Sequence, residues 1–270
     1  MQNLQSQCNV STPLILIDFD QTITKQDTIG TLGKFGVSYT RNPKPWSYFV
    51  DIYLKDYRDH RDHLPDIPKG DFKAFVKRLD SYQQVERASQ VRVSQHKVFE
   101  GLTRDTLTHH ANSLKNEYLR PGVIDTLQAY KDQVRIISLN WSKDWIQGFL
   151  QELDVSKNHI FSNDLEFDAL DKCTGNIIPA VLTTGDKQTV INTFRQHYKT
   201  IYIGDSLGDI EALIEANVGI IIGNDQSLLN ALQDFGHVVE RDVNKPSTLY
   251  QVDHWDQIKC LLHLQHQHIQ

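Results

Sequence analysis

Two aspartates, Asp18 and Asp20, stand one residue apart directly after the aliphatic run 14–17. In an extended segment, residues i and i+2 lie on the same face, so both carboxylates are expected to share one crevice. Two carboxylates this close repel each other unless a cation lies between them or one of them holds a proton. An Asp-rich turn that ends a strand is the structural alternative, because Asp is a common turn residue. The pair therefore indicates either metal and proton-transfer chemistry or a turn.

Ser138 and Lys187 are two further candidates, each beside an expected connection between a strand and a helix. Ser138 ends the run VRIIS, where a hydroxyl and the next backbone N–H groups, those of Leu139 and Asn140, can bind a phosphate. Lys187 falls in an expected first helical turn, an unfavourable place for a cation, which suggests another reason for its position. A capping serine and a solvated surface lysine are the structural alternatives.

The run GDSLGD, residues 204–209, places Asp205 and Asp209 four residues apart after the aliphatic run TIYI. Acidic residues suit a helix N-terminus, so capping is the structural alternative here. One acid is enough for a cap, however, and a glycine at the end of a strand lets the backbone approach a ligand. The pair therefore favours a functional site.

These residues require a sheet whose strand ends converge, and the second half of the chain has the pattern of one. Strands separated by helices of about 10–15 residues favour βαβ units and a parallel sheet. We therefore predict an α/β fold with a doubly wound parallel sheet. The expected strands are 14–17, 134–139, 159–162, 200–204 and 218–223, and the expected helices are 123–130, 145–153, 187–198, 207–216, 226–235 and 249–264, with a small hairpin within 166–178.

The segment that follows the first strand has a different character. Residues 24–36 are polar and contain three glycines, which suggests a hinge or flap. From there to about residue 116, aromatic residues such as Trp46, Tyr53 and Tyr57 recur at helical spacing. We predict two domains, which are an α/β core domain of residues 1–26 plus 119–270 and an inserted helical cap domain of residues 27–118.

The composition narrows the class of function. Of 270 residues, 39% are hydrophobic and 23% are charged, and the net charge of −6 provides no positive field for nucleic acid or an acidic membrane. The three cysteines form no CxxC unit, and the first residues, MQNLQSQCNVSTP, lack the pattern of a secretory signal. We therefore expect a cytoplasmic protein with no nucleic-acid or membrane partner. No oligomeric state is predicted.

The ordered set of motifs resembles the haloacid dehalogenase (HAD) superfamily of phosphohydrolases. The set comprises DxDxT (18–22), Ser138, Lys187, GDxxxD (204–209) and GIIIG (219–223). The resemblance extends over about residues 12–26 and 119–240, and it implies a HAD-like Rossmannoid core with the helical insertion as a cap. It also implies a phosphatase that acts on a small soluble phosphate ester through an aspartyl-phosphate, with Mg²⁺ as cofactor. A phosphomutase and a HAD-fold binding protein without turnover are the alternatives.

The resemblance also implies roles for single residues. Asp18 matches the nucleophile, and Asp20 matches the general acid that protonates the leaving oxygen and later activates water. Lys187 and a metal ion would lower the repulsion between an anionic nucleophile and an anionic phosphate. The implied metal ligands are Asp18, Asp20 through its backbone carbonyl, Asp205 and Asp209, and the implied substrate-binding residues are Thr22, Ser138, Leu139, Asn140 and Trp141, beside Lys187.

More narrowly, the stretches 85–93 and 139–146 resemble fungal HAD-like hydrolases, which are similar to the HAD domain of plant bifunctional thiamine-phosphate phosphatases. This implies a heteroaromatic phosphate such as thiamine monophosphate, with a sugar phosphate or phosphoserine as alternatives. Trp141 is expected near the phosphate, and a cation–π contact with a cationic ring is worth about 0.5–2 kcal/mol. For the cap aromatics, plain helix–helix core is the favoured alternative. Glu86 and Arg92 either contact the substrate or form an ion pair within the cap.

Overall fold

A six-stranded parallel sheet, in the order β3-β2-β1-β6-β7-β8, forms the centre of the computed structural model, which describes residues 13–267. The order reverses at β1, which has β2 on one side and β6 on the other. In open α/β sheets, ligands bind outside the carboxyl ends of the strands at this point of reversal. The strands are β1 (Leu14–Ile17), β2 (Val134–Ser138), β3 (Ile160–Ser162), β6 (Thr200–Gly204), β7 (Val218–Ile222) and β8 (Leu249–Val252).

Both faces of the sheet are covered by helices, as the continuous apolar strands require. Leu14 and Leu16 of β1 join an apolar cluster with α8 (Thr184–Arg195), α9 (Ile210–Glu215) and α10 (Gln226–Asp234). Ile15 and Ile17 join a second cluster on the other face, with the helices α5 (Arg104–Tyr118), α6 (Val123–Gln128), α7 (Lys143–Phe149) and α11 (Trp255–Gln267). The predicted doubly wound α/β fold is therefore confirmed.

The end of the chain differs from the prediction of one helix over 249–264. Residues Leu249–Val252 form β8, an edge strand that pairs with β7, and α11 begins only at Trp255. All four residues of β8 are buried. A run of four residues is too short for its period to separate a strand from a helix, and the pairing with β7 decides the outcome.

The predicted hinge or flap over 24–36 is also wrong, because α1 (Ile29–Thr40) occupies most of it. A Cβ atom on Gly33 would lie 2.4 Å from the indole of Trp46, and one on Gly36 would lie 2.6 Å from the ring of Phe99. Both glycines therefore allow close packing of aromatic rings against a helix.

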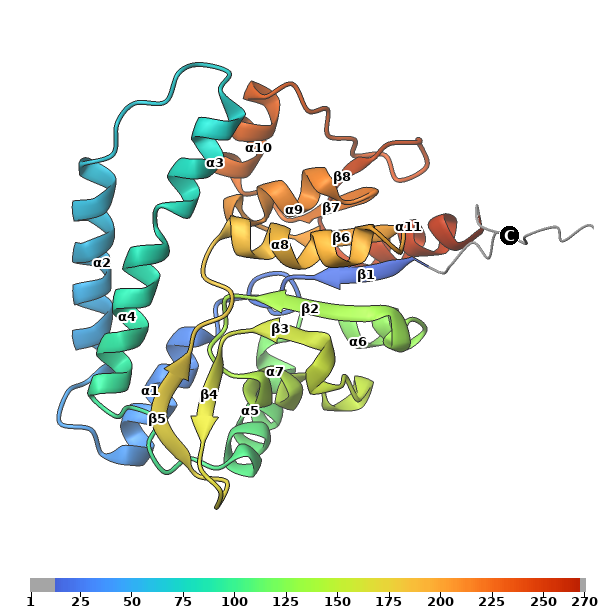
Figure 1. Cartoon of the computed structure of the whole chain (residues 1–270). Helices are drawn as coiled ribbons and strands as arrows, with labels where there is room; N and C mark the ends of the chain where they lie inside the picture. The colour runs from blue at the N-terminus through green and yellow to red at the C-terminus, as the bar shows by residue number, and fades with distance from the viewer. Residues whose placement is uncertain (1–12, 268–270) are drawn as a thin grey trace, which may run out of the picture.

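Three helices stand beside the end of the sheet toward which the arrows of β2 and β3 point (Figure 1). They are α2 (Trp46–Asp62), α3 (Phe72–Asp80) and α4 (Gln83–Gln95). An antiparallel hairpin of β4 (Asp164–Phe167) and β5 (Cys173–Ile178) packs against α4, which confirms the predicted excursion.

The predicted domain boundaries stay a prediction. Helix α5 falls in the range assigned to the cap, yet it packs closely on α7. This close packing depends on Gly148 of α7, because a Cβ atom there would lie 2.5 Å from the Thr108 carbonyl oxygen of α5. None of the helices that the structure describes is both long enough and apolar enough to cross a membrane.

Candidate active site

Asp18 and Asp20 follow β1, but their carboxylates face different partners. The backbone N–H of Asp18 donates to the Ile203 carbonyl at 2.9 Å, which continues the pairing with β6. Its Oδ1 accepts from the N–H of Phe19 at 2.8 Å, and the residue is 7% exposed. Gln21 then has a φ of 61°, so the chain turns sharply away from the strand. Burial raises the pKa of Asp18, partly offset by Lys187.

Asp20 is held by a network of donors at the start of α1. Its Oδ1 accepts from the backbone N–H and hydroxyl of Thr28, at 2.7 and 2.6 Å, and its Oδ2 accepts from Nδ2 of Asn140 at 2.8 Å. Burial and the nearby Asp27 raise the pKa of Asp20 to about 6, although the bonds from Thr28 and Asn140 lower it. A carboxyl group of this kind can release or accept a proton close to neutral pH.

Lys187 lies in the first turn of α8, which begins with a capping box of Thr183 and Asp186. Its Nζ lies 3.2 Å from Oδ1 of Asp18 and 2.7 Å from Oδ1 of Asp209. The side chain is almost completely buried. Burial lowers the pKa of Lys187, but the charges of Asp18 and Asp209 raise it by more, so the ammonium stays charged.

Asp209 is the buried centre of the loop after β6. It accepts from the hydroxyl of Tyr202 at 2.6 Å and from the backbone N–H groups of Asp205 and Ser206, both at 3.2 Å. A Cβ atom on Gly204 would lie 2.5 Å from Cγ of Asp209, so this turn requires glycine. Burial raises the pKa of Asp209, but Lys187 and the hydrogen bonds lower it by more.

Asp205 is the third carboxylate of this group. Its Oδ1 accepts from the hydroxyl of Thr22 at 2.7 Å. Burial and the charge of Asp209 raise the pKa of Asp205 to about 7, against the lowering effect of Thr22 and Lys187. Thr22 thus holds the carboxylate of Asp205 with a neutral hydrogen bond.

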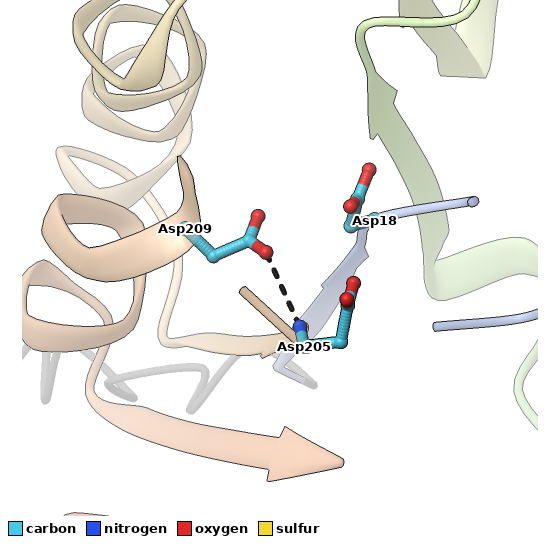
Figure 2. Close-up of side chains that lie close together, drawn as sticks. All are labelled: Asp18, Asp205 and Asp209. Atoms are coloured by element: carbon cyan, nitrogen blue, oxygen red, sulfur yellow. Dashed lines mark hydrogen bonds between the residues drawn. The ribbon is translucent and has the colours of Figure 1, made fainter. Parts of the chain in front are cut away.

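The three carboxylates fit a divalent metal ion. Figure 2 shows Asp18, Asp205 and Asp209 gathered at the ends of β1 and β6, and their ligand oxygens all lie within 4.8 Å of one another. When all three carboxylates are ionised, Lys187 balances one of the three negative charges and two remain. Carboxylate oxygens are the ligands that Mg²⁺ prefers. The carboxylate of Asp20 is not part of this group.

A cavity of about 490 Å³ opens above these carboxylates. Its strand-end wall, so called below, is formed by Asp18, Asp20, Ser138, Leu139, Trp141, Lys187 and Asp205. Its cap wall is formed by Trp46, Phe49, Val50, Tyr53 and Leu54 of α2 and by Glu86 and Ser89 of α4. The structure thus brings most of the predicted site residues to one cavity.

Thr22 and Asn140 lie behind this surface. Both are fully buried and are not among the residues that line the cavity. Thr22 donates to Asp205, and Asn140 donates to Asp20 and to the hydroxyl of Thr28. In this geometry they position carboxylates, and their contact with a substrate stays a prediction.

Among the cap aromatics, Trp46 and Tyr53 line the cavity, whereas Tyr57 stacks on Tyr82 with ring centroids 4.5 Å apart. Trp46 meets Trp141 edge to face, with centroids 6.1 Å apart. These rings are therefore at once part of the packing and part of the cavity surface.

Sequence reasoning missed Thr28 and Tyr202. Tyr202 carried a signal, because a tyrosine inside an aliphatic strand must place its buried hydroxyl near a partner. Thr28 was hidden by the interpretation of residues 24–36 as a flap, although a threonine directly before a helix is a common N-cap.

The family of the chain follows from comparison with known proteins. A family model described as haloacid dehalogenase-like hydrolase matches residues 15–213. The match includes all the candidate catalytic and metal-binding residues from Asp18 to Asp209. The chain therefore belongs to the haloacid dehalogenase-like hydrolases.

The individual relatives have low sequence identity to this chain. The chain is similar to a CTO1 family protein of Schizosaccharomyces pombe, 26% identical over 257 residues that cover 86% of this chain and 89% of the relative. It is also similar to the bifunctional TH2 protein, mitochondrial, of Arabidopsis thaliana, 23% identical over 209 residues that cover 71% of this chain and 33% of the relative. A solved structure of cytosolic 5'-nucleotidase IIIB bound to cytidine has the same fold, with a TM-score of 0.57, 16% identity, and coverage of 95% of this chain and 86% of that chain.

Proposed function

We propose that this haloacid dehalogenase-like hydrolase is a Mg²⁺-dependent phosphomonoesterase of small, soluble phosphate esters. One observation supports this proposal above all. Asp18, Lys187 and Asp205 line one cavity, and a second acid, Asp20, lines it too but belongs to a separate hydrogen-bond network. A nucleophile, a cation for the phosphoryl oxygens and an independent proton donor are the groups that phosphate ester hydrolysis needs.

The chain's own residues divide the reaction into two steps. In the first, a carboxylate oxygen of Asp18 attacks phosphorus and forms an aspartyl-phosphate, while Asp20 gives its proton to the leaving oxygen. In the second, Asp20 takes a proton from a water molecule, which attacks phosphorus and releases inorganic phosphate and free Asp18. Lys187 and Ser138 hold the phosphoryl oxygens throughout. Asp18 and Asp205, with Asp209 in support, would hold Mg²⁺, which would neutralise phosphate charge.

For the substrate, we propose a heteroaromatic phosphate, with thiamine monophosphate as one candidate. The resemblance to the HAD domain of plant thiamine-phosphate phosphatases and the similarity to the TH2 protein support it. The aromatic rings of Trp46, Tyr53 and Trp141 on the cavity surface suit a flat ring. A phosphomutase would use the same strand-end wall, so it remains the second candidate.

The test is hydrolysis of p-nitrophenyl phosphate with Mg²⁺, with EDTA, and after Asp18→Asn. We expect EDTA to abolish phosphate release and Asp18→Asn to reduce kcat by at least about 10⁴-fold. Asp51→Asn, on the exposed side of α2, is the control and should retain full activity. Activity that survives Asp18→Asn would refute the nucleophile assignment. Transfer of phosphate between sugar hydroxyls in place of its release to water would favour a phosphomutase.

A further inference from the structure

The cap wall combines aromatic rings with negative charge. Glu86 lines it together with Trp46 and Tyr53, and Asp27 lines the same cavity. Among the described residues that line the cavity, Lys187 is the only cationic side chain, and its Nζ is already paired with Asp18 and Asp209. A substrate with a carboxylate or a second phosphate in its leaving group would find no positive partner on this wall.

Glu86 is oriented by a single strong hydrogen bond. The hydroxyl of Tyr53 donates to its Oε1 at 2.6 Å. Burial raises the pKa of Glu86, and the bond from Tyr53 lowers it. Burial and the charge of Glu86 also raise the pKa of Tyr53, so the phenol remains a neutral donor. No lysine, arginine or histidine of the described chain forms an ion pair with Glu86.

The carboxylate of Glu86 is not explained by a need to link α2 to α4. The same two helices are linked by an ion pair between Asp56 of α2 and Arg92 of α4, and neither of these residues lines the cavity. Arg92, which the sequence offered as a substrate contact, is thus used within the cap. Glu86 differs from this pair in that it lines the cavity and its carboxylate has only a neutral partner among the described residues.

We propose that Glu86, oriented by Tyr53, makes the enzyme select phosphate esters whose leaving group carries a positive charge. A cation in the cavity would compensate the carboxylate, and the faces of Trp46 and Trp141 would add cation–π attraction. The inference rests on the proposed phosphatase function, and it adds the charge of the leaving group and the residue that recognises it.

The experiment compares two esters of the same shape, choline phosphate and its uncharged carbon analogue 3,3-dimethylbutyl phosphate. We expect the wild type to show at least about tenfold higher kcat/KM on choline phosphate, an effect of the size of a desolvated cation–π and charge contact. Glu86→Gln should remove most of this preference, while kcat/KM on the neutral ester changes less than threefold, roughly the neutral contribution of one contact.

Asp56→Asn is the matched control, because it removes one negative charge from the same helix pair but outside the cavity. It should leave the preference unchanged. Tyr53→Phe keeps the carboxylate and should weaken the preference only in part. A further measurement needs no variant: choline should inhibit wild-type hydrolysis of p-nitrophenyl phosphate at a lower concentration than 3,3-dimethylbutanol does.

Equal kcat/KM on the two esters in the wild type, or an intact preference in Glu86→Gln, would overturn the inference. Hydrolysis of p-nitrophenyl phosphate separates this outcome from a failure of the proposed function. An enzyme that hydrolyses this neutral ester with Mg²⁺ but ignores leaving-group charge is a phosphatase without the proposed recognition by Glu86. If the protein hydrolyses none of the esters, the proposed phosphatase function itself is wrong.

Discussion

The two walls of the cavity differ in the contacts that their charged groups make. On the strand-end wall, charged groups are joined in networks: Lys187 contacts Asp18 and also Asp209, which lies behind the wall and accepts from Tyr202. On the cap wall, the aromatic rings of α2 stand beside one carboxylate of α4, Glu86, that has only a neutral partner.

This difference predicts how each wall responds to change. A group on the strand-end wall belongs to a network, so its loss should damage turnover and stability together. A side chain on the cap wall shares few polar contacts with its neighbours, so its loss should change the choice of substrate and leave the chemistry intact.

Lys187→Met is expected to have the largest effect, because it leaves Asp18 and Asp209 buried without their cation. We expect a loss of about 3 kcal/mol in the free energy of unfolding and of about 10³-fold in kcat. Urea unfolding and p-nitrophenyl phosphate hydrolysis measure the two. Because a cation that binds only the folded state stabilises it, added MgCl₂ should recover more stability in this variant than in the wild type.

Lys115→Met is the control for that change. Lys115 forms an ion pair with Glu152 at the surface, where such a pair contributes about 0–1 kcal/mol. If both variants lose the same stability, the strand-end wall is not the tightly coupled network described here.

Glu211 of α9 sharpens the comparison, because it is a buried acid outside both walls. It is 7% exposed, and its Oε2 has no hydrogen-bond partner in the described part of the chain. Burial, with the charge of Asp80 at the end of α3, raises the pKa of Glu211 from 4.5 to about 7. Because the folded state binds this proton more tightly, the contribution of Glu211 to stability is present below pH 4.5 and is lost as the pH rises through 7.

Glu211→Gln should therefore stabilise the protein by about 2 kcal/mol at pH 8 and have little effect near pH 4. Urea unfolding across this pH range gives the result, and the same change at exposed Glu117 of α5 is the control. A variant that is less stable than the wild type at pH 8 would mean that Glu211 has an ionic partner.

The convergence of the site could be predicted from the sequence because it depends on local signals. Each of Asp18, Ser138 and Asp205 follows an apolar run, and the carboxyl ends of parallel strands meet at one edge of the sheet. Lys187 could be added from its place in a helix that precedes another such strand. Asp18, Ser138 and Asp205, which are far apart in the chain, thus lie together in one site, because each stands at the end of a parallel strand.

Side-chain direction and cap geometry could not be predicted in this way. Asp18 and Asp20 line one cavity as predicted, but the sequence did not show that the carboxylate of Asp20 accepts from Thr28, at the start of α1. Trp46 and Tyr57 have the same helical pattern, yet one lines the cavity and the other stacks on Tyr82. Which face of α2 meets the cavity is decided by packing between distant segments.

Tyr202→Phe tests the network of the strand-end wall with a smaller change. It removes a buried hydroxyl that donates to the Asp209 carboxylate, so we expect a loss of about 1.5 kcal/mol in stability. Tyr250→Phe in β8 is the matched control, because that buried hydroxyl bonds only backbone groups, of Lys245 and Ser247, and should cost about 1 kcal/mol or less. Thermal and urea unfolding measure both, and the reverse order would show that the charge of Asp209 does not strengthen its bonds.

Trp46→Leu is expected to have the smallest effect on the chemistry and the clearest effect on substrate choice. Loss of one aromatic contact should raise KM for phenyl phosphate about fivefold, or about 1 kcal/mol, with kcat nearly unchanged. Tyr57→Leu is the matched control, since Tyr57 is an aromatic residue of the same helix that stacks on Tyr82 and does not line the cavity. Its KM should equal that of the wild type. A fall in kcat without a change in KM for Trp46→Leu would mean that the cap wall acts on phosphoryl transfer itself, and the separation of the two walls would fail.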